Sequence, residues 1–269
     1  MTYKKYVSFL ARKILCNSIV YKIYEKILWN QIKGAAMPEH IGVILDGNRR
    51  WASEHSMPSW IGHQFGAEKV DDLLNWCQDL KVKTVTLYAF STENFSRAGE
   101  EVQGIMRIFN ERLKTVFSNE RINRNRVKVS AIGRISLLPE STQKLIRLVE
   151  DRTNNFDQYY VNLAIVYGGR AEIVDAMKKI AKKVKAGIID AERIDEKIIE
   201  EHLYTAHLPK SEPDLIIRTS GEERLSGFLL WQGAYSELCF VDVFWPDFRR
   251  IDLWRVIRTF QQRERRFGS

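Results

Sequence analysis

The sequence has few cysteines and lacks the common signatures of metal and redox sites. Its 269 residues contain three cysteines, Cys16, Cys77 and Cys239, which are odd in number and widely separated. No CxxC or Cys/His ligand spacing is present, which argues against a zinc module and a disulfide scaffold. A reduced, cytoplasmic chain is the simplest interpretation.

Two nucleotide-binding signatures are also missing. The sequence contains no GxxxxGK[ST] motif and no GxGxxG motif after a strand-like run. A P-loop nucleotidase and a dinucleotide enzyme are therefore unlikely. It also lacks a DDxxD cluster, so any metal site must be sparse and shared with a substrate.

No apolar run approaches the roughly 20 residues that a membrane-spanning helix requires. The net charge is +8, but residues 1–36 hold seven basic residues against one acidic residue, so the remaining 233 residues carry only +2. Because a nucleic-acid-binding domain needs a basic face on its folded body, we expect no nucleic-acid partner.

Residues 1–36 are predicted to form a basic amphipathic helical arm. Their apolar residues recur at helical spacing, at positions Tyr3, Val7, Leu10, Ile14, Val20, Ile23, Tyr24, Ile27 and Leu28. Two interpretations fit this pattern: a helix on an anionic membrane surface, which would make the protein peripheral, or a helix packed on the protein's own body or a partner.

The rest of the chain, residues 37–269, alternates strand-like and helical patterns and is predicted to be one catalytic domain. The strands are expected at 41–45, 84–90, 127–132, 161–167, 215–218 and 238–244. The helices are expected at 63–80, 100–118, 139–154, 170–186, 194–204, 228–236 and from 247 onward. This alternation predicts an α/β fold with a six-stranded, mostly parallel sheet flanked by helices.

Polar residues cluster directly after several of these strands. Asp46-Gly47-Asn48-Arg49-Arg50 follows the first strand. The clusters after later strands are Ser91, Glu93, Asn94 and Arg97; Gly168, Gly169 and Arg170; and Arg218, Thr219, Ser220 and Gly221, with Arg224 and Ser226 close behind. Since ligands of open α/β sheets bind at the carboxyl ends of the strands, these clusters are expected to converge on one rim.

The chemistry of this rim favours a phosphate-bearing ligand. Arginine forks suit diphosphate oxygens, and Asp46 could hold Mg²⁺ against them, with Glu237 as a second carboxylate. A phosphatase with an aspartyl nucleophile is a rival, although the second Asp that such enzymes usually carry is Asn48 here. Taken alone, His63 and Glu237 could equally be structural. An apolar stripe could line a tunnel or be ordinary core, and it comprises Leu74, Trp76, Leu87, Ala89, Val102, Ile105, Met106 and Phe109.

Long motifs in fixed order resemble the cis-prenyltransferase family, the undecaprenyl and dehydrodolichyl diphosphate synthases. They are HIGVILDGNRRWA, GHQFGAEKV, LYAFSTENFSR, YGGR, DLIIRTSGEERLSGFLLWQGAYSEL, WPDF and RERRFG, and they cover residues 37–269. The basic N-terminal arm is more similar to archaeal or eukaryotic members than to bacterial ones.

The resemblance implies a homodimeric, Mg²⁺-dependent enzyme that joins isopentenyl diphosphate to an allylic diphosphate such as farnesyl or geranylgeranyl diphosphate, forming Z double bonds. The residues it implies for catalysis are Asp46, Asn48 and Asn94, and for Mg²⁺ Asp46 and Glu237. For the allylic diphosphate they are Gly47, Asn48, Arg49, Arg50, Trp51, His63, Phe90, Ser91, Glu93 and Arg97. For isopentenyl diphosphate they are Arg218, Arg224, Ser226, Arg266 and Gly268, the last two in a tail expected to reach across the dimer.

Three positions depart from the family pattern. Ser59 stands where many bacterial members carry Arg, Glu223 stands where they carry His, and Ala98 replaces a common Pro after Arg97. The alternatives are therefore a prenyltransferase with a different prenyl acceptor, an isoprenoid diphosphate phosphohydrolase, or a non-catalytic synthase subunit.

Overall fold

The computed structural model describes residues 19–96 and 99–263, which fall into two compact units. One unit comprises 38–247. The other joins the described parts of 1–37 and 248–269. The predicted N-terminal arm thus shares a unit with the C-terminal segment.

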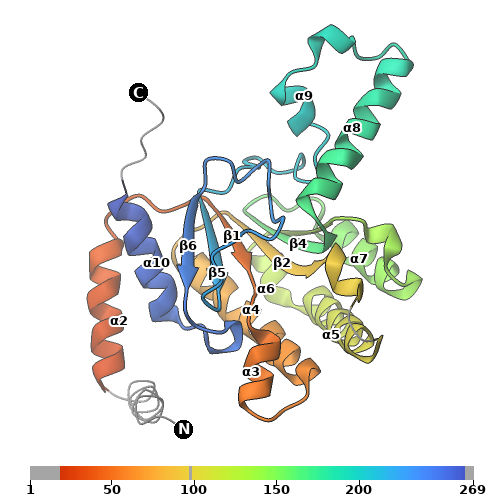
Figure 1. The fold of residues 1–269 in the computed structure, drawn as a ribbon. Helices are drawn as coiled ribbons and strands as arrows, with labels where there is room; N and C mark the ends of the chain where they lie inside the picture. Colours follow the sequence, from red (N-terminus) through yellow and green to blue (C-terminus); the bar gives the residue numbers. More distant parts are fainter. Residues whose placement is uncertain (1–18, 97–98, 264–269) are drawn as a thin grey trace. The chain divides into compact units, whose positions relative to one another are not determined.

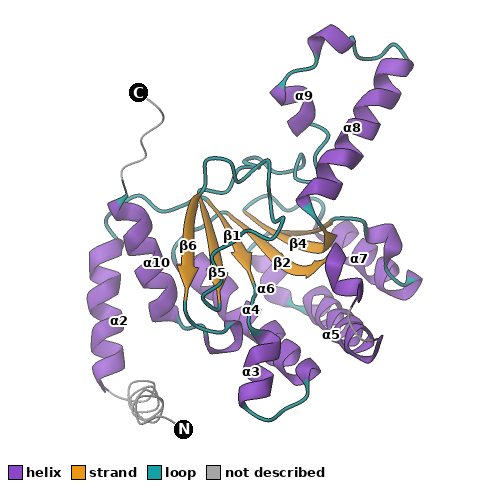
Figure 2. Ribbon diagram, in the orientation of Figure 1, coloured by secondary structure: helices purple, strands orange, loops and turns teal. Residues whose placement is uncertain are grey.

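The larger unit is built on a six-stranded parallel sheet, as predicted (Figure 2). The strands are β1 (His40–Ile44), β2 (Thr84–Ser91), β3 (Val127–Ile132), β4 (Tyr159–Tyr167), β5 (Leu215–Thr219) and β6 (Glu237–Val241). Their order is β3-β4-β2-β1-β5-β6, and every neighbouring pair is parallel. All residues of the adjacent strands β1 and β5 are buried, which explains their continuous apolar runs.

Helices connect the strands (Figure 1). They are α3 (Asn48–Glu54), α4 (Ser59–Asp79), α5 (Gly99–Ser118), α6 (Glu120–Arg124), α7 (Glu140–Thr153), α8 (Gly169–Lys185) and α9 (Glu196–Glu200). Short 3₁₀ segments occur at η1 (Thr92–Ser96), η2 (Ile135–Leu137), η3 (Ala191–Arg193) and η4 (Trp245–Asp247). Helix α4 packs against α3 and α5, and α5 packs against α7. Helix α8 extends away from the sheet, and α9 contacts α8.

The prediction of a helix at 228–236 is wrong. Residues 226–235 form consecutive turns, because Ser226, Gly227 and Leu229 have positive φ values of 47°, 78° and 43° that a right-handed helix excludes. The apolar residues that suggested a helix are core residues instead. The helix predicted at 194–204 is also shorter, with only α9 helical, and β6 ends at Val241, three residues before the predicted 244.

This turn segment completes the core beneath the carboxyl ends of the strands. Phe228 is fully buried, and its ring stacks on Tyr88 with centroids 4.9 Å apart. Gly42 allows this approach, since a Cβ there would lie 2.9 Å from the Phe228 ring. Burial of an aromatic ring of this size contributes about 2–3 kcal/mol, so the segment is firmly held against the sheet.

The smaller unit contains α2 (Ile19–Ile32) and α10 (Arg250–Gln262), which pack against each other. Trp29 contacts Trp254 with ring centroids 5.5 Å apart, and Arg250 pairs with Glu25 at 3.0 Å. The helix predicted in the arm is therefore present over 19–32, while residues 1–18 lie outside the described residues. Every helix within 19–96 and 99–263 is too short or too polar to cross a bilayer.

Candidate functional site

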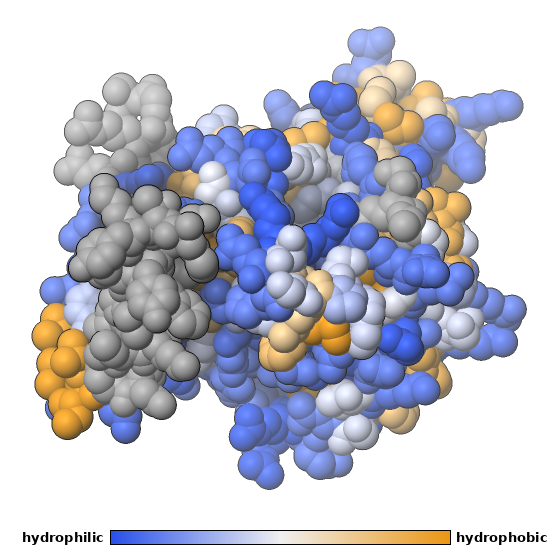
Figure 3. Space-filling view, turned by 60° about the horizontal axis from the view of Figure 1, so that its bottom comes forward, coloured by the Kyte–Doolittle hydropathy of each residue, from blue (hydrophilic) through white to orange (hydrophobic). Residues whose placement is uncertain are grey.

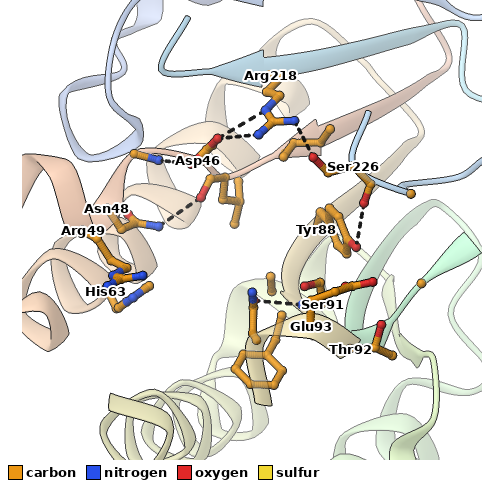
Figure 4. Close-up of a pocket in the computed structure, with 18 of the residues that line it drawn as sticks. Asp46, Asn48, Arg49, His63, Tyr88, Ser91, Thr92, Glu93, Arg218 and Ser226 are labelled. Atoms are coloured by element: carbon orange, nitrogen blue, oxygen red, sulfur yellow. Dashed lines mark hydrogen bonds and ion pairs between the residues drawn. The ribbon is translucent and has the colours of Figure 1, made fainter. Parts of the chain in front are cut away.

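The polar clusters after β1, β2, β4 and β5 meet around one cavity of about 1180 Å³ (Figure 4). The predicted residues that line it are Asp46, Gly47, Asn48, Arg49, Arg50, His63, Phe90, Ser91, Glu93, Asn94, Arg218 and Ser226. Gly168, Gly169 and Arg170 at the start of α8 line it as well, as does Ser59. Convergence on the carboxyl edge of the sheet follows from the parallel strands.

Asp46 lies immediately beyond β1 and is held by cations and by its own turn. Its Oδ2 accepts hydrogen bonds from Arg218 Nη2 at 2.7 Å and Nε at 3.2 Å, and its Oδ1 accepts from Gly47 N at 2.6 Å. Partial burial raises the pKa of Asp46, but the hydrogen bonds and positive charges of Arg218 and Arg50 outweigh this effect and hold the pKa below its usual value. Asp46 is therefore a carboxylate at neutral pH.

Arg218, in β5, links the two ends of the site. Its guanidinium is buried, with 6% of the side chain exposed, and its Nη1 donates to Ser226 Oγ at 2.8 Å and to the Arg224 carbonyl oxygen. The Tyr88 hydroxyl donates to the Ser226 carbonyl oxygen at 3.3 Å. Arg218 and Ser226 are thereby fixed in position at one end of the cavity, opposite α3 (Figure 4).

The loop after β1 turns sharply into α3. Gly47 has a φ of 101°, and Asn48 Nδ2 donates to the Leu45 carbonyl oxygen at 3.0 Å. Helix α4 approaches so closely that a Cβ at Gly66 would lie 2.2 Å from Asn48 Oδ1. That oxygen is buried and accepts no hydrogen bond from the described residues, so Asn48 retains an unused acceptor beside the cavity.

A carboxylate from α5 holds two predicted site residues together. Glu101 Oε1 lies 3.3 Å from His63 Nε2 and 3.5 Å from Arg49 Nε, and 9% of its side chain is exposed. Arg49 and His63 accordingly lie side by side in Figure 4. The sequence reasoning did not single out Glu101, because a charged residue on a helix is usually a solvated one.

The end of β2 supplies the opposite wall of the cavity. Asn94 Oδ1 accepts a hydrogen bond from Ser91 N at 3.0 Å, which fixes the start of η1. Burial raises the pKa of Glu93, but hydrogen bonds from the Glu93 backbone and from Ser91 and Thr92 outweigh it and lower the pKa. Glu93 is therefore also ionised.

Several predicted residues are not brought to the cavity. Trp51 does not line it, because α3 turns its side chain toward Asp247, whose Oδ1 accepts from Trp51 Nε1 at 3.0 Å. The Arg224 guanidinium contacts Glu222 rather than the cavity wall, at 2.7 Å. Arg97, Arg266 and Gly268 lie outside the described residues.

Glu237 lies at the amino end of the parallel strands, whereas Asp46 lies at their carboxyl end. It is the first residue of β6 and pairs in register with Leu215, the first residue of β5, whereas Asp46 follows the last residues of β1. One chain therefore does not bring these two carboxylates together, and the Asp46–Glu237 pair on Mg²⁺ stays a prediction. The reason is that Glu237 begins its strand, while the other site residues lie at or beyond the carboxyl ends of theirs.

An apolar cavity of about 150 Å³ adjoins the polar one. Leu45, Asn48, His63 and Ala89 line both cavities. Of the apolar stripe predicted from the sequence, Leu74, Leu87, Ala89, Ile105 and Phe109 line the second cavity, whereas Trp76, Val102 and Met106 do not. The site thus combines cations and carboxylates with a hydrophobic chamber behind them.

Metal-binding capacity in the cavity is sparse. Among the described residues, no three His, Cys, Asp or Glu side chains gather as they would around a fully protein-coordinated ion. A single hard carboxylate such as Asp46 fits Mg²⁺ when diphosphate oxygens supply the other ligands.

A family model described as putative undecaprenyl diphosphate synthase matches residues 44–268. The chain belongs to this family. It is 54% identical over 257 residues to a tritrans,polycis-undecaprenyl-diphosphate synthase (geranylgeranyl-diphosphate specific) of Methanocaldococcus jannaschii, which covers 96% of this chain and 92% of the relative. The Methanopyrus kandleri protein of the same name is 52% identical over 93% of this chain and 91% of its own length.

Solved structures of the family agree with the fold. The lavandulyl diphosphate synthase of Lavandula x intermedia, in complex with dimethylallyl diphosphate, superimposes with a TM-score of 0.83 and 37% identity, covering 87% of this chain and 99% of that one. A probable undecaprenyl diphosphate synthase of Campylobacter jejuni gives a TM-score of 0.71 at 32% identity, covering 87% of this chain and 100% of that one. The family resemblance is confirmed, and the chain is a prenyltransferase of the Z-isoprenyl diphosphate synthase class.

Proposed function

We propose that the chain extends geranylgeranyl diphosphate by successive cis additions of isopentenyl units. The relatives with 54% and 52% identity carry this primer in their names. The observation that carries the proposal is the junction of the two cavities: a diphosphate group can bind among the cations of the first while its hydrocarbon tail enters the second.

The residues divide into two halves. Gly47, Asn48, Arg49, Arg50 and His63 form the proposed cradle for the allylic diphosphate, with Ser91, Glu93, Asn94 and Arg97 beside the reacting carbons. Arg218, Arg224 and Ser226, with Arg266 and Gly268 of the tail, form the proposed isopentenyl diphosphate site. Asp46 stands between the halves, hydrogen-bonded to Arg218 and Arg50.

The chemistry follows from this arrangement. As the allylic carbon–oxygen bond ionises, negative charge grows on the departing diphosphate, and Arg49, Arg50 and backbone N–H groups near Gly47 are placed to stabilise it. Arg218 and Ser226 hold the second substrate so that its double bond faces the allylic carbon, which removes much of the entropic barrier. The isopentenyl double bond then attacks the allylic carbon and forms the new carbon–carbon bond. A proton passes from the isopentenyl unit to the released diphosphate, which leaves the new double bond in the product.

We propose Mg²⁺ as the cofactor, held by Asp46 and substrate oxygens. When bound, it neutralises diphosphate charge and makes that group a better leaving group. Arg218 positions the Asp46 carboxylate for this purpose, while Gly47 N orients its second oxygen.

We further propose that the catalytic domain, 37–269, works as a homodimer. The edge strand β6 is half-buried along its whole length and carries Leu238, Cys239, Phe240 and Val241. A second copy could supply the Glu237 carboxylate and the tail containing Arg266 and Gly268, which the sequence predicts to reach a neighbouring site.

We propose that the protein is cytoplasmic and that its N-terminal arm makes a peripheral membrane contact. Ile19, Val20, Ile23 and Ile27 of α2 are between 48% and 78% exposed. They recur at helical spacing with Lys22 and Lys26 nearby, as expected for a helix on an anionic bilayer. Figure 3 shows hydrophobic surface at the left edge of that view.

The primer assignment is tested by comparing three allylic diphosphates in separate assays. Farnesyl, geranylgeranyl and dimethylallyl diphosphate are each incubated with the protein, labelled isopentenyl diphosphate and Mg²⁺, and kcat/KM is measured from butanol-extractable label. We expect geranylgeranyl diphosphate to give the highest kcat/KM. Incorporation with dimethylallyl diphosphate alone would contradict the assignment, and phosphate release without isopentenyl diphosphate would identify a phosphohydrolase.

A further inference from the structure

Glu222 is a carboxylate shared between two arginines of the rim. Its Oε1 accepts a hydrogen bond from Arg50 Nη1 at 3.1 Å, and its Oε2 pairs with Arg224 Nη1 at 2.7 Å. Arg50 belongs to the proposed allylic cradle and Arg224 to the proposed isopentenyl diphosphate site. One side chain thus lies between one cation from each half of the site.

The backbone that carries Glu222 is held in place. Ser220 and Gly221 both have positive φ, 77° and 72°, so the chain turns abruptly after β5. Their N–H groups donate to the carbonyl oxygens of Val243 at 2.8 Å and Val241 at 3.1 Å. Because this turn is anchored to the chain beyond β6, the Glu222 carboxylate has a defined position.

The two arginines depend on Glu222 to different degrees. Arg50 Nη2 also donates to Ser220 Oγ at 2.7 Å and to Asp46 Oδ1 at 3.3 Å. The Arg224 side chain is 65% exposed and its guanidinium is directed by Glu222. A long exposed side chain that loses its partner samples many rotamers, and ordering it again on binding costs affinity.

We propose that Glu222 is a positioning residue that sets the guanidinium groups of Arg50 and Arg224 for the two diphosphates together. This inference rests on the proposed function of the two half-sites. Glu222 binds one nitrogen of each guanidinium and leaves other N–H donors of both available to phosphate oxygens. It also offsets the mutual repulsion of the two cations.

If Glu222 acted only through its charge, removing it would have the opposite effect on KM from removing a positioning residue. A carboxylate near a diphosphate site repels the ligand, so removing it should lower KM. Positioning predicts instead that removing Glu222 raises KM for both substrates. Glu223 is the matched control, since it is exposed and adjacent, and its replacement removes the same charge.

The experiment compares Glu222→Gln, Glu222→Ala and Glu223→Gln in the full-length protein, with circular dichroism and thermal unfolding to confirm folding. We expect KM for the allylic primer and for isopentenyl diphosphate each to rise roughly 3- to 10-fold in the Glu222 variants, the range of two partly exposed ion pairs. We expect kcat of the Glu222 variants to change little. In Glu223→Gln we expect KM to be unchanged or lower. Unchanged or lowered KM in the Glu222 variants, or a loss confined to kcat, would overturn the proposal.

A binding arm separates this inference from the proposed reaction. Inorganic diphosphate is titrated calorimetrically into each protein without Mg²⁺, so that the side chains alone carry the binding. Weaker binding to Glu222→Gln than to Glu223→Gln supports the proposal even if wild type extends no primer, and equal binding contradicts it even if wild type is active.

Discussion

Arg218 places two of its nitrogen atoms, Nη2 at 2.7 Å and Nε at 3.2 Å, on the same carboxylate oxygen of Asp46. Asp46 follows β1 and Arg218 lies in the adjacent strand β5, where it pairs in register with Ile44, two residues before Asp46. This contact joins the ends of β1 and β5 and directs Asp46 into the cavity. It therefore contributes both to stability and to the proposed catalysis.

Replacing Asp46 by Asn keeps the shape of the side chain but removes its charge. We expect turnover to fall at least about 100-fold, because the proposed Mg²⁺ site loses its anionic protein ligand. We also expect a loss of about 1–3 kcal/mol in the free energy of unfolding, since the buried Arg218 loses its counter-charge. Steady-state kinetics and urea unfolding check both. Asp72→Asn, which removes an exposed carboxylate 2.9 Å from Lys69, is the control and should change neither. Near-wild-type turnover of the Asp46 variant would refute this role.

Glu101→Gln tests the carboxylate that His63 and Arg49 share. We expect kcat/KM for the allylic primer to fall roughly 10-fold as both side chains lose their orientation. KM for isopentenyl diphosphate should stay the same, because neither residue belongs to that half. The neighbouring exposed Glu100→Gln is the matched control. An equal loss of kcat/KM for the allylic primer and for isopentenyl diphosphate would contradict this role of Glu101 in the allylic half.

Leu74→Ala tests how the apolar cavity limits the product. Leu74 and Val161 line both the 150 Å³ cavity and a smaller one of about 50 Å³ beyond it. Removing the Leu74 side chain should connect the two and lengthen the product, measured by chromatography of the dephosphorylated alcohols. Leu73→Ala is the control, since Leu73 is fully buried but lines neither cavity. It should lower stability by about 2–5 kcal/mol without changing chain length. Identical product distributions from both variants would exclude Leu74 as a determinant.

His40 should make stability fall in mild acid. Burial lowers its pKa to about 4, and the charge of Asp214 and a hydrogen bond to the Lys210 backbone only partly oppose this shift. Below about pH 6.5, His40 binds a proton in the unfolded chain but stays neutral in the folded one. Its contribution to the free energy of unfolding is therefore fully present above that pH and declines as the pH falls toward 4. We expect this residue to account for about 2 kcal/mol of loss between pH 7 and pH 5. Urea unfolding at both pH values measures it, and an equal pH dependence in His40→Gln would show that another group is responsible.

The sequence predicted the sheet and its rim well, for a physical reason. Central parallel strands are buried on both faces, so β1 and β5 appear as short apolar runs, and the polar residues that end them must lie at one edge. Helix α3 was not predicted, since its seven residues are too few to show a helical period. The same helix turns Trp51 away from the cavity.

What the sequence could not show depends on tertiary contacts or on backbone conformation. Glu101 and Glu222 resemble ordinary solvated charges until the fold brings Arg49 and His63 to the first and Arg50 and Arg224 to the second. The turns at 226–235 have helix-like apolar spacing, and only their positive φ values exclude a helix. Glu237 required the sheet register to show that it lies at the far edge.

The central claim is that this chain builds Z double bonds onto an allylic diphosphate, and the stereochemistry of the product tests it most directly. Wild-type protein is incubated with all-trans geranylgeranyl diphosphate, ¹³C-labelled isopentenyl diphosphate and Mg²⁺, and the dephosphorylated product is examined by NMR. We expect every added unit to carry a Z double bond while the primer's own bonds remain E. Added units with E geometry, or a primer recovered without any added unit, would contradict it.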